Sequence, residues 1–169
     1  MSDLPHLAGC MSKKLTHIDE EGHPQMVDVS AKPSTDRMAR AEAWVRMSAT
    51  ALEAITTGRI KKGDVLGIAE LAGIQGAKRT SDLIPLCHPL PLDAVSVRVT
   101  AVDGAIHVEA TARAHWRTGV EMEALAAVSA AALTVYDMTK AIDRGIVIDG
   151  VRLLEKRGGR SGSWTASTG

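Results

Sequence analysis

The chain has 169 residues, within the usual size of one domain, and its 45% hydrophobic and 24% charged content is that of a globular protein, which excludes a disordered chain or a fibre. Because 20 basic residues balance 20 acidic ones, no overall field would hold a polyanion such as DNA or an acidic membrane, and any anion site must be local. With three Trp, one Tyr and no Phe, the core must consist of aliphatic side chains and Met.

The cysteine pattern and the apolar segments predict a cytoplasmic protein. Cys10 and Cys87 lie far apart without a repeating spacing, which is typical of a reduced, intracellular chain. Residues 1–25 contain no apolar run of signal-peptide length, so we expect no export. The longest apolar stretch, residues 124–136, is shorter than the ~20 residues of a transmembrane helix. We therefore expect no membrane partner.

A flexible N-terminal tail is expected over residues 1–14, a single folded domain over 15–162 and a C-terminal tail over 163–169. The first predicted element is a short strand at 26–30, where two valines alternate with polar residues. A helix is predicted next, over 34–58, because it has N-cap candidates at its start and a Thr-Gly stop. Its expected core-facing residues are Met38, Ala41, Val45, Leu52 and Ile55.

The middle of the chain combines a helix, a stiff loop and a hairpin. A second helix is predicted over 65–77, where three glycines weaken the propensity but permit close packing. Three prolines make 83–92 a stiff, largely apolar connection. Apolar residues alternate with polar ones over 95–112 on both sides of Asp103-Gly104, a tight-turn pair, and predict an antiparallel hairpin.

A long and mostly apolar helix is predicted from Glu121 to about Asp143. Such a helix must be covered on all sides, by the sheet and a neighbouring helix or by another subunit. Closing strands are predicted at 146–148 and 151–154, around an Asp-Gly pair. This order of elements predicts an α+β sandwich in which helices pack on one face of an antiparallel sheet.

Asp137 and Lys140 are the first candidates for chemistry. Because they lie three residues apart near a helix end, both side chains share one helical face and can touch. The helix dipole disfavours a carboxylate near a helix C-terminus, so the position of Asp137 calls for a compensating interaction or a functional role. From the spacing alone, an ordinary ion pair stays the alternative to catalysis.

Glu121 and Glu123 lie at the predicted start of the same helix. Acidic side chains stabilise a helix N-terminus, which is a sufficient structural reason for both. If the segment is extended instead, residues two apart face the same side and can accept hydrogen bonds from a purine-like edge. Position alone leaves both interpretations open.

Cys87 and His88 lie side by side between prolines, which suggests a metal site. Adjacent ligands rarely converge on one ion, and no second Cys or His pair occurs at zinc spacing, so we expect no metal and no cofactor. A lone loop histidine is more often structural, although a rigid loop can aim an imidazole at a substrate.

Basic residues lie mostly in loops and at element ends, where each is by default ordinary surface charge. A converging subset would form a local phosphate clamp. The candidates are Arg37, Lys61, Lys62, Lys78, Arg79, Lys156, Arg157 and Arg160. The segment 158–162, Gly-Gly-Arg-Ser-Gly, lacks the Walker spacing and is no NTPase loop, but it can close over an anion.

Six stretches, occurring in order, carry a resemblance to a known family. They are 26–32 (MVDVSAK), 62–65 (KGDV), 72–80 (AGIQGAKRT), 83–90 (LIPLCHPL), 119–125 (GVEMEAL) and 136–141 (YDMTKA). Together they closely resemble the cyclic pyranopterin monophosphate synthases, the molybdenum-cofactor biosynthesis protein C family, from about Leu15 to Gly162. The resemblance implies a ferredoxin-like fold and a lyase that converts 3′,8-cyclo-7,8-dihydro-GTP into cyclic pyranopterin monophosphate with loss of pyrophosphate. It also implies a homohexamer, a trimer of dimers, with active sites between subunits.

The same resemblance implies roles for particular residues. Asp137 matches the general acid/base, Lys140 its essential partner and Lys62 a second essential lysine. Positions that hold the substrate or line its pocket are matched by Leu86, Cys87, His88, Glu121, Met122, Glu123, Arg37 and Lys156. Two residues depart from the family pattern. Arg160 replaces the usual Lys and keeps the charge with a different geometry, and Thr139 replaces the usual Cys without moving its neighbours out of register.

Two other classes of function remain as alternatives. An RNA-binding or regulatory module would need a basic face with aromatic stacking residues, and this neutral, Phe-free chain offers little of either. A structural oligomer subunit would suit the Ala-rich helix. Of the three, only the enzyme would release pyrophosphate from the cyclised GTP substrate. We therefore expect a small-molecule nucleotide as the ligand, and no nucleic acid.

Overall fold

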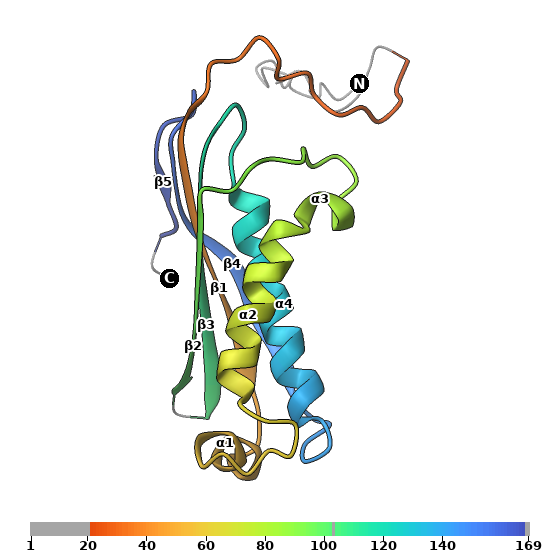
Figure 1. Cartoon of the computed structure of the whole chain (residues 1–169), viewed down its shortest axis with the longest axis vertical. Helices are drawn as coiled ribbons and strands as arrows, with labels where there is room; N and C mark the ends of the chain where they lie inside the picture. The colour runs from red at the N-terminus through yellow and green to blue at the C-terminus, as the bar shows by residue number, and fades with distance from the viewer. Residues whose placement is uncertain (1–20, 103, 168–169) are drawn as a thin grey trace, which may run out of the picture.

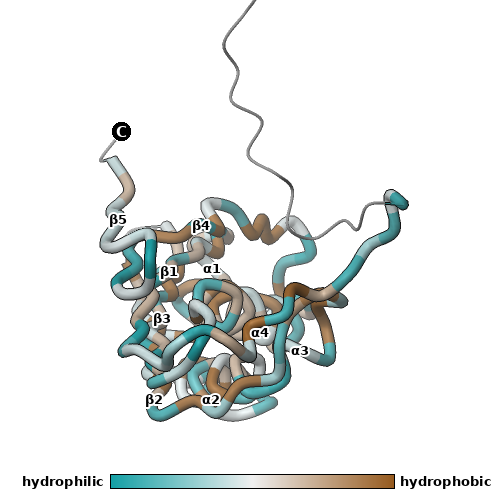
Figure 2. Tube along the Cα trace, turned by 90° about the horizontal axis from the view of Figure 1, so that it is seen from above, coloured by the Kyte–Doolittle hydropathy of each residue, from teal (hydrophilic) through white to brown (hydrophobic). Residues whose placement is uncertain are grey.

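The computed structural model describes residues 21–102 and 104–167, which fold as an antiparallel sheet with helices on one face (Figure 1). The elements, in chain order, are β1 (Thr35–Arg46), α1 (Ala49–Thr56), α2 (Val65–Lys78), α3 (Thr80–Leu83), β2 (Ala94–Val102), β3 (Ala105–Trp116), α4 (Glu121–Thr139), β4 (Val147–Arg157) and β5 (Trp164–Thr165). Figure 2 shows the same layers from above, with α2 and α4 to one side of the strands.

The sheet has five strands in the order β2-β3-β1-β4-β5, and every neighbouring pair is antiparallel. If the helices between β1 and β2 are taken as one crossover, the first four strands follow a β-α-β-β-α-β path. This path is that of a ferredoxin-like sandwich. The predicted α+β class, with helices on one face of an antiparallel sheet, is confirmed.

The predicted helix over 34–58 is wrong for most of its length, because this segment forms the central strand β1 and only then the short helix α1. The alanines and valine of β1 alternate with polar residues, so that Ala39, Ala41, Ala43 and Val45 all face the helices and are fully buried. Their period of two outweighs the helix propensity of alanine, because β1 pairs along its length with β3 and over most of it with β4.

Two smaller predictions also need correction, while the hairpin and two helices are confirmed. Residues 26–30 form no strand. The two predicted closing strands are one strand, β4, in which Gly150 adopts a φ of 60° beside register shifts against β1. Helices α2 and α4 and the β2–β3 hairpin are as predicted, except that α4 ends at Thr139. Asp103 of the predicted turn lies outside the described residues, as do residues 1–14 of the predicted tail.

The C-terminal segment takes part in the sheet. Trp164 and Thr165, within the predicted tail over 163–169, form β5 and pair with Lys156 and Glu155 of β4. This short strand lies at the edge of the sheet, beyond β4 (Figure 1).

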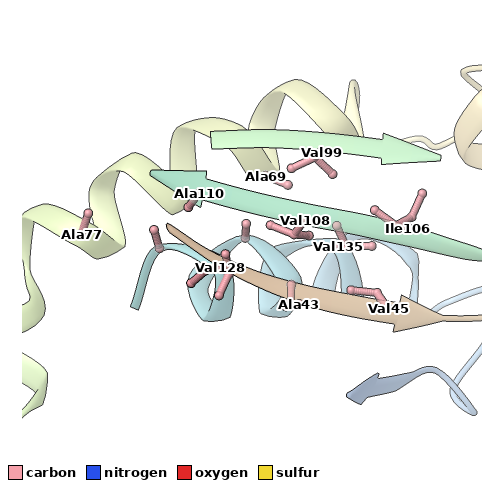
Figure 3. Close-up of a cluster of buried hydrophobic side chains, with 14 of the residues drawn as sticks. Ala43, Val45, Ala69, Ala77, Val99, Ile106, Val108, Ala110, Val128 and Val135 are labelled. Atoms are coloured by element: carbon pink, nitrogen blue, oxygen red, sulfur yellow. The ribbon is translucent and has the colours of Figure 1, made fainter. Parts of the chain in front are cut away.

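The core lies between the sheet and α4 and is built from alanine and valine (Figure 3). Val128 and Val135 of α4 are fully buried among side chains of β1 and β3, among them Val45, Ile106 and Val108. Burial of one such side chain stabilises a fold by roughly 1.5–3 kcal/mol. Small residues on both layers allow helix and sheet to approach closely, as the lack of Phe predicts.

Helices α2 and α4 approach each other through glycines. A Cβ added at Gly76 would lie 2.6 Å from the Cβ of Ala130, and one at Gly73 would lie 3.0 Å from the carbonyl oxygen of Ala127. The expectation that glycines of this helix permit close packing is therefore confirmed. Part of the helical layer stays uncovered, since Leu71 of α2 is 68% exposed and Leu133 of α4 is 61% exposed.

Within residues 21–102 and 104–167, no helix has both the length and the apolar composition that crossing a membrane requires.

Candidate functional site

Asp137 lies in the last turn of α4 and binds two lysines. Its Oδ1 accepts a hydrogen bond from Lys140 Nζ at 2.7 Å, and its Oδ2 accepts one from Lys62 Nζ at 2.8 Å. Lys62 Nζ also donates to the carbonyl oxygen of Asp137 at 2.8 Å. The predicted contact between Asp137 and Lys140 is thus present, and Lys62 arrives from the loop between α1 and α2.

The local sequence explains how Lys62 reaches this position. Asp64 caps α2, because its side chain accepts hydrogen bonds from the backbone N–H groups of Leu66 and Gly67. Gly63, with a φ of 102°, supplies the left-handed turn that precedes the cap. The Lys-Gly-Asp-Val motif therefore begins a helix and, in the same turn, aims Lys62 at the end of α4.

The two lysines set the charge state of this cluster. Hydrogen bonds from Lys140 and then Lys62 lower the pKa of Asp137 to about 2, so it is a carboxylate at neutral pH. Asp137 in turn raises the pKa of Lys140, which stays an ammonium. All three side chains are about half exposed, so a ligand can reach them.

The opposite end of α4 carries two glutamates with different surroundings. Glu121 Oε1 accepts a hydrogen bond from Lys156 Nζ of β4 at 2.9 Å. Glu123 is only 3% exposed, and its Oε1 accepts a hydrogen bond from the Cys87 thiol at 3.7 Å. Both residues belong to the first turn of a formed helix, so the structure has them in helical and not extended backbone.

Burial controls the ionisation of the Cys87–Glu123 pair. Burial, and next the charge of Glu123, raises the pKa of the Cys87 thiol to about 11. Burial also raises the pKa of Glu123, although a bond to its own backbone N–H and the one from Cys87 oppose the change. A buried carboxyl with a neutral thiol beside it is an unusual arrangement that points to a functional role.

A basic cavity of about 620 Å³ lies beside this end of α4. Its lining includes Lys32, Arg37, Arg117 and Arg160, and no acidic side chain. The guanidinium of Arg37 is fixed, because Nε donates to the Trp116 carbonyl at 3.2 Å and Nη2 to the Arg117 carbonyl at 3.4 Å. Four cations around one cavity can hold a polyphosphate.

The cavity confirms that some basic residues converge and shows two that the sequence did not single out, Lys32 and Arg117. Both lie outside helices and strands, where spacing carries no signal. Lys32 is the last residue of the first family-like stretch, 26–32, and this stretch is the only sequence feature that points to it. Gly159 closes the cavity against Arg37, since a Cβ there would lie 1.7 Å from Arg37 Nη1. Only glycine permits this approach.

The remaining candidates lie at the same end of the molecule. His88 Nε2 donates a hydrogen bond to the Val27 carbonyl at 2.7 Å and so ties the Pro-rich loop to the N-terminal segment. Leu86 is half-buried in this loop, and Met122 in the first turn of α4 is 36% exposed. Within the part of the chain that the structure describes, His, Cys, Asp and Glu side chains form no group of three suited to a metal ion.

The candidate residues form two groups at opposite ends of α4 (Figure 1). The first, which we call the lysine–aspartate cluster, consists of Lys62, Asp137 and Lys140. The second, the basic-cavity end, consists of Lys32, Arg37, Leu86, Cys87, His88, Arg117, Glu121, Met122, Glu123, Lys156 and Arg160. Asp137 lies sixteen positions after Glu121 in this helix, which corresponds to a separation of about 24 Å. One chain therefore cannot bring both groups to one small ligand.

Comparison with known proteins gives a consistent result. The model of the MoaC family matches residues 26–159. A protein of Cereibacter sphaeroides strain KD131 is 58% identical over 156 residues, which cover 90% of this chain and 98% of that protein. One of Novosphingobium aromaticivorans is 58% identical over 153 residues, with 90% and 98% covered, and one of Thermomicrobium roseum is 55% identical over 153 residues, with 89% and 92% covered. All three are named cyclic pyranopterin monophosphate synthase.

Proposed function

The chain belongs to the MoaC family, and we propose that it is a lyase of molybdenum-cofactor biosynthesis. It converts 3′,8-cyclo-7,8-dihydro-GTP into cyclic pyranopterin monophosphate and releases pyrophosphate. The observation that carries this proposal is a carboxylate held by two lysines at one end of α4, with a cavity lined by four cations at the other. A substrate with a triphosphate and a reactive ring needs both kinds of group.

In the proposed site, the cations of the basic cavity and Lys156 bind the triphosphate. The phosphates neutralise these side chains and fix the nucleotide for the reaction. Met122 and the Leu86-Cys87-His88 loop border the same region, and the two glutamates of α4 can accept hydrogen bonds from a purine-derived ring. We propose these residues as the substrate-binding set.

Asp137, Lys140 and Lys62 form the proposed catalytic set. Asp137 starts as a carboxylate and is the proton acceptor, whereas Lys140 starts as an ammonium and is the donor. When a substrate phosphate draws one lysine away, Asp137 loses a hydrogen bond and becomes a stronger base. A sugar hydroxyl then attacks the α-phosphorus, its proton passes to the base, and the bond to the pyrophosphate oxygen breaks.

We further propose that each active site is shared by two protomers of a homohexamer, a trimer of dimers. The separation of about 24 Å along α4 supports sharing, because a second protomer can place its basic-cavity end against the lysine–aspartate cluster. The exposed Leu71 and Leu133 also favour burial against another subunit. We place the enzyme in the cytoplasm, which the unpaired Cys87 thiol favours.

The test is an assay of pyrophosphate release from the purified protein and 3′,8-cyclo-7,8-dihydro-GTP. The wild-type chain should turn over, and Asp137→Ala should lower kcat by roughly 10²–10⁴-fold without preventing folding. Asp149→Ala is the matched control, because Asp149 is likewise a carboxylate in an ion pair, with Arg46 at 2.7 Å, and pairs with neither Lys62 nor Lys140. Turnover retained by Asp137→Ala would defeat the catalytic assignment.

A further inference from the structure

Lys62 lies near the end of residues 48–63, which are hydrogen-bonded along their length and which we call the Lys62 segment. Ser48 caps α1 at its start, because its side chain accepts a hydrogen bond from a backbone N–H of the first turn. At the end of α1, Gly58 adopts a φ of 67°, and two backbone N–H groups return to carbonyls of the last turn in a Schellman motif. The Gly63 N–H then closes the next turn. The position of Ser48 therefore influences the position of Lys62.

Asp143 fastens the Lys62 segment to the end of α4. Its Oδ2 accepts a hydrogen bond from the Ser48 N–H at 2.8 Å, and its Oδ1 accepts one from the Gly145 N–H at 2.7 Å. These two bonds lower the pKa of Asp143, so it is a carboxylate at neutral pH. Asp143 is in turn held by α4, because its backbone N–H donates to the carbonyl of Thr139, the last residue of that helix, at 3.3 Å.

The Lys62 segment and the end of α4 are thus joined at two points, at the end of the molecule where α1 lies (Figure 1). One contact joins Ser48 to Asp143, and the other joins Lys62 to Asp137. A half-exposed lysine on a flexible stem is a loosely fixed partner by itself. The contact at Asp143 reduces the freedom that Lys62 must lose, because it holds the backbone that carries the lysine, and the buried Ile60 holds it from the core side.

We propose that Asp143 is a positioning residue of the proposed enzyme: by binding the Ser48 N–H, it holds the Lys62 segment where the Lys62 ammonium meets the Asp137 carboxylate. Asp143 touches no reacting atom and takes no chemical step. Its role in turnover rests on the proposed function, whereas its effect on Lys62 belongs to the folded chain and can be measured without substrate.

The carboxyl group of Asp137 reports whether Lys62 is in place. Its Oδ2 accepts the Lys62 hydrogen bond at 2.8 Å, so the carbon-13 signal of this carboxyl at neutral pH should shift when the bond is lost. Asp143→Ala should move the signal in the direction in which Lys62→Ala moves it, and by a smaller amount. In the Lys62→Ala background, Asp143→Ala should leave the signal in place, because the lysine through which it acts is absent. A shift that persists in that background would overturn the inference.

Turnover gives the second measurement. Asp143→Ala should lower kcat for pyrophosphate release by roughly ten- to a hundredfold and change KM by less than about twofold, since the side chains of the basic cavity are untouched. Arg144→Ala, which alters the exposed charged neighbour in the same turn, is the matched control and should keep kcat within about twofold of the wild-type value. A merely structural role predicts a lower melting temperature with kcat of the folded variant unchanged, and that result would overturn the inference.

Asp143→Asn covers the case in which the alanine variant does not fold, which thermal unfolding checks. Asparagine keeps the size of the side chain and one acceptor oxygen, so the Asp137 signal should shift in the same direction and by less than in Lys62→Ala. An unchanged signal in every folded Asp143 variant would overturn the inference. An inactive wild-type enzyme would remove the proposed function alone, because the signal is recorded without substrate.

Discussion

Asp137 joins two lysines that come from different parts of the chain. Lys140 is one helical turn away, while Lys62 is 75 positions away in sequence and reaches the carboxylate through the turn at Gly63. Because both carboxylate oxygens are occupied, either lysine can move to a phosphate while the other still orients Asp137. The cluster therefore keeps its geometry during a change in charge.

Asp137 should titrate far below an ordinary aspartate. Its pKa of about 2 lies below the ordinary value of 3.8, so its pairing is fully present above pH 3.8 and is lost as the pH falls through about 2. Lys140→Ala removes the largest cause and should move the titration midpoint up towards 3.8. Carbon-13 NMR of carboxyl-labelled aspartate can follow the change. Lys61→Ala, which removes the neighbouring charge, is the control and should leave the midpoint in place.

Gly159→Ala should weaken anion binding at the basic cavity. A methyl group there would meet Arg37 Nη1 and displace the guanidinium, and the φ of 75° adds strain for any L side chain. We expect about a tenfold rise in the Kd for pyrophosphate by calorimetry. Gly162→Ala is the matched control, since its φ of 65° carries the same strain but nothing lies within 4 Å of the new Cβ. Equal losses in both variants would contradict a specific role of Gly159.

For the candidate site, the sequence predicts contacts between residues of the same helix, but it does not predict contacts that loop residues make. The contact between Asp137 and Lys140 follows from helical spacing. Lys62 carries no such signal, because it is one of eight basic candidates in the sequence and only the resemblance singles it out. Lys32 and Arg117 are missed because a loop residue's neighbours depend on tertiary contacts, which no local period encodes.

Among the elements, α2 and α4 depend on a seam of small residues. At Gly76 a methyl group would lie 2.6 Å from Ala130 Cβ and 2.9 Å from the carbonyl oxygen of Ala126, so the two helices must separate to admit it. Gly76→Ala should therefore lower the free energy of unfolding by roughly 1–3 kcal/mol, although alanine favours a helix.

Chemical denaturation followed by circular dichroism measures this loss. Gln75→Ala, at an exposed position of the same helix, is the control and should change stability by less than about 0.5 kcal/mol. A stabilised Gly76→Ala variant would mean that helix propensity outweighs the contact between α2 and α4.

The strands show where local signals mislead. Spacings of three and four residues among Met38, Ala41 and Val45 favour a helix, and so does alanine itself. The alternation that includes Ala39 and Ala43 favours a strand, and pairing with β3 and β4 selects it. The hairpin of β2 and β3 is predictable because its pairing is local and its alternation has no competing helical period.

β4 illustrates the same limit in a single residue. An Asp-Gly pair in sequence signals a turn, and Gly150 does adopt a φ of 60°. The strand nevertheless continues, because the glycine lies at a register shift where a Cβ would approach the ring of Trp44 at 2.9 Å. The Asp-Gly pair thus predicts a positive φ at Gly150. Whether the chain turns there or forms a bulge within a continuous strand depends on pairing with the neighbouring strand.

In the whole molecule, the two groups of site residues are kept apart by α4, and mixed oligomers should reveal whether they meet across subunits. Asp137→Ala and Lys156→Ala chains should each be inactive alone. Co-expressed in equal amounts, they should regain about a quarter of wild-type activity, since half of the pairs are mixed and one of their two sites is intact.

The control is a mixture of Asp137→Ala with Lys62→Ala. Both changes lie in the lysine–aspartate cluster, so every site keeps a damaged half and activity should stay absent. Differently tagged chains, purified in tandem, confirm that mixed oligomers formed. If the mixture of Asp137→Ala and Lys156→Ala chains has no activity although mixed oligomers have formed, the active site is complete within one chain.

The length of α4 has a consequence for how this chain can vary. One residue inserted between Glu121 and Asp137 would lengthen the helix by about 1.5 Å and rotate everything after it by about 100°, so that Asp137 would turn away from Lys62. The connection between β2 and β3 carries no such constraint, because a Cβ at Gly104 would meet nothing within 4 Å. Insertions and deletions among homologous chains should therefore accumulate at that connection and be absent from α4.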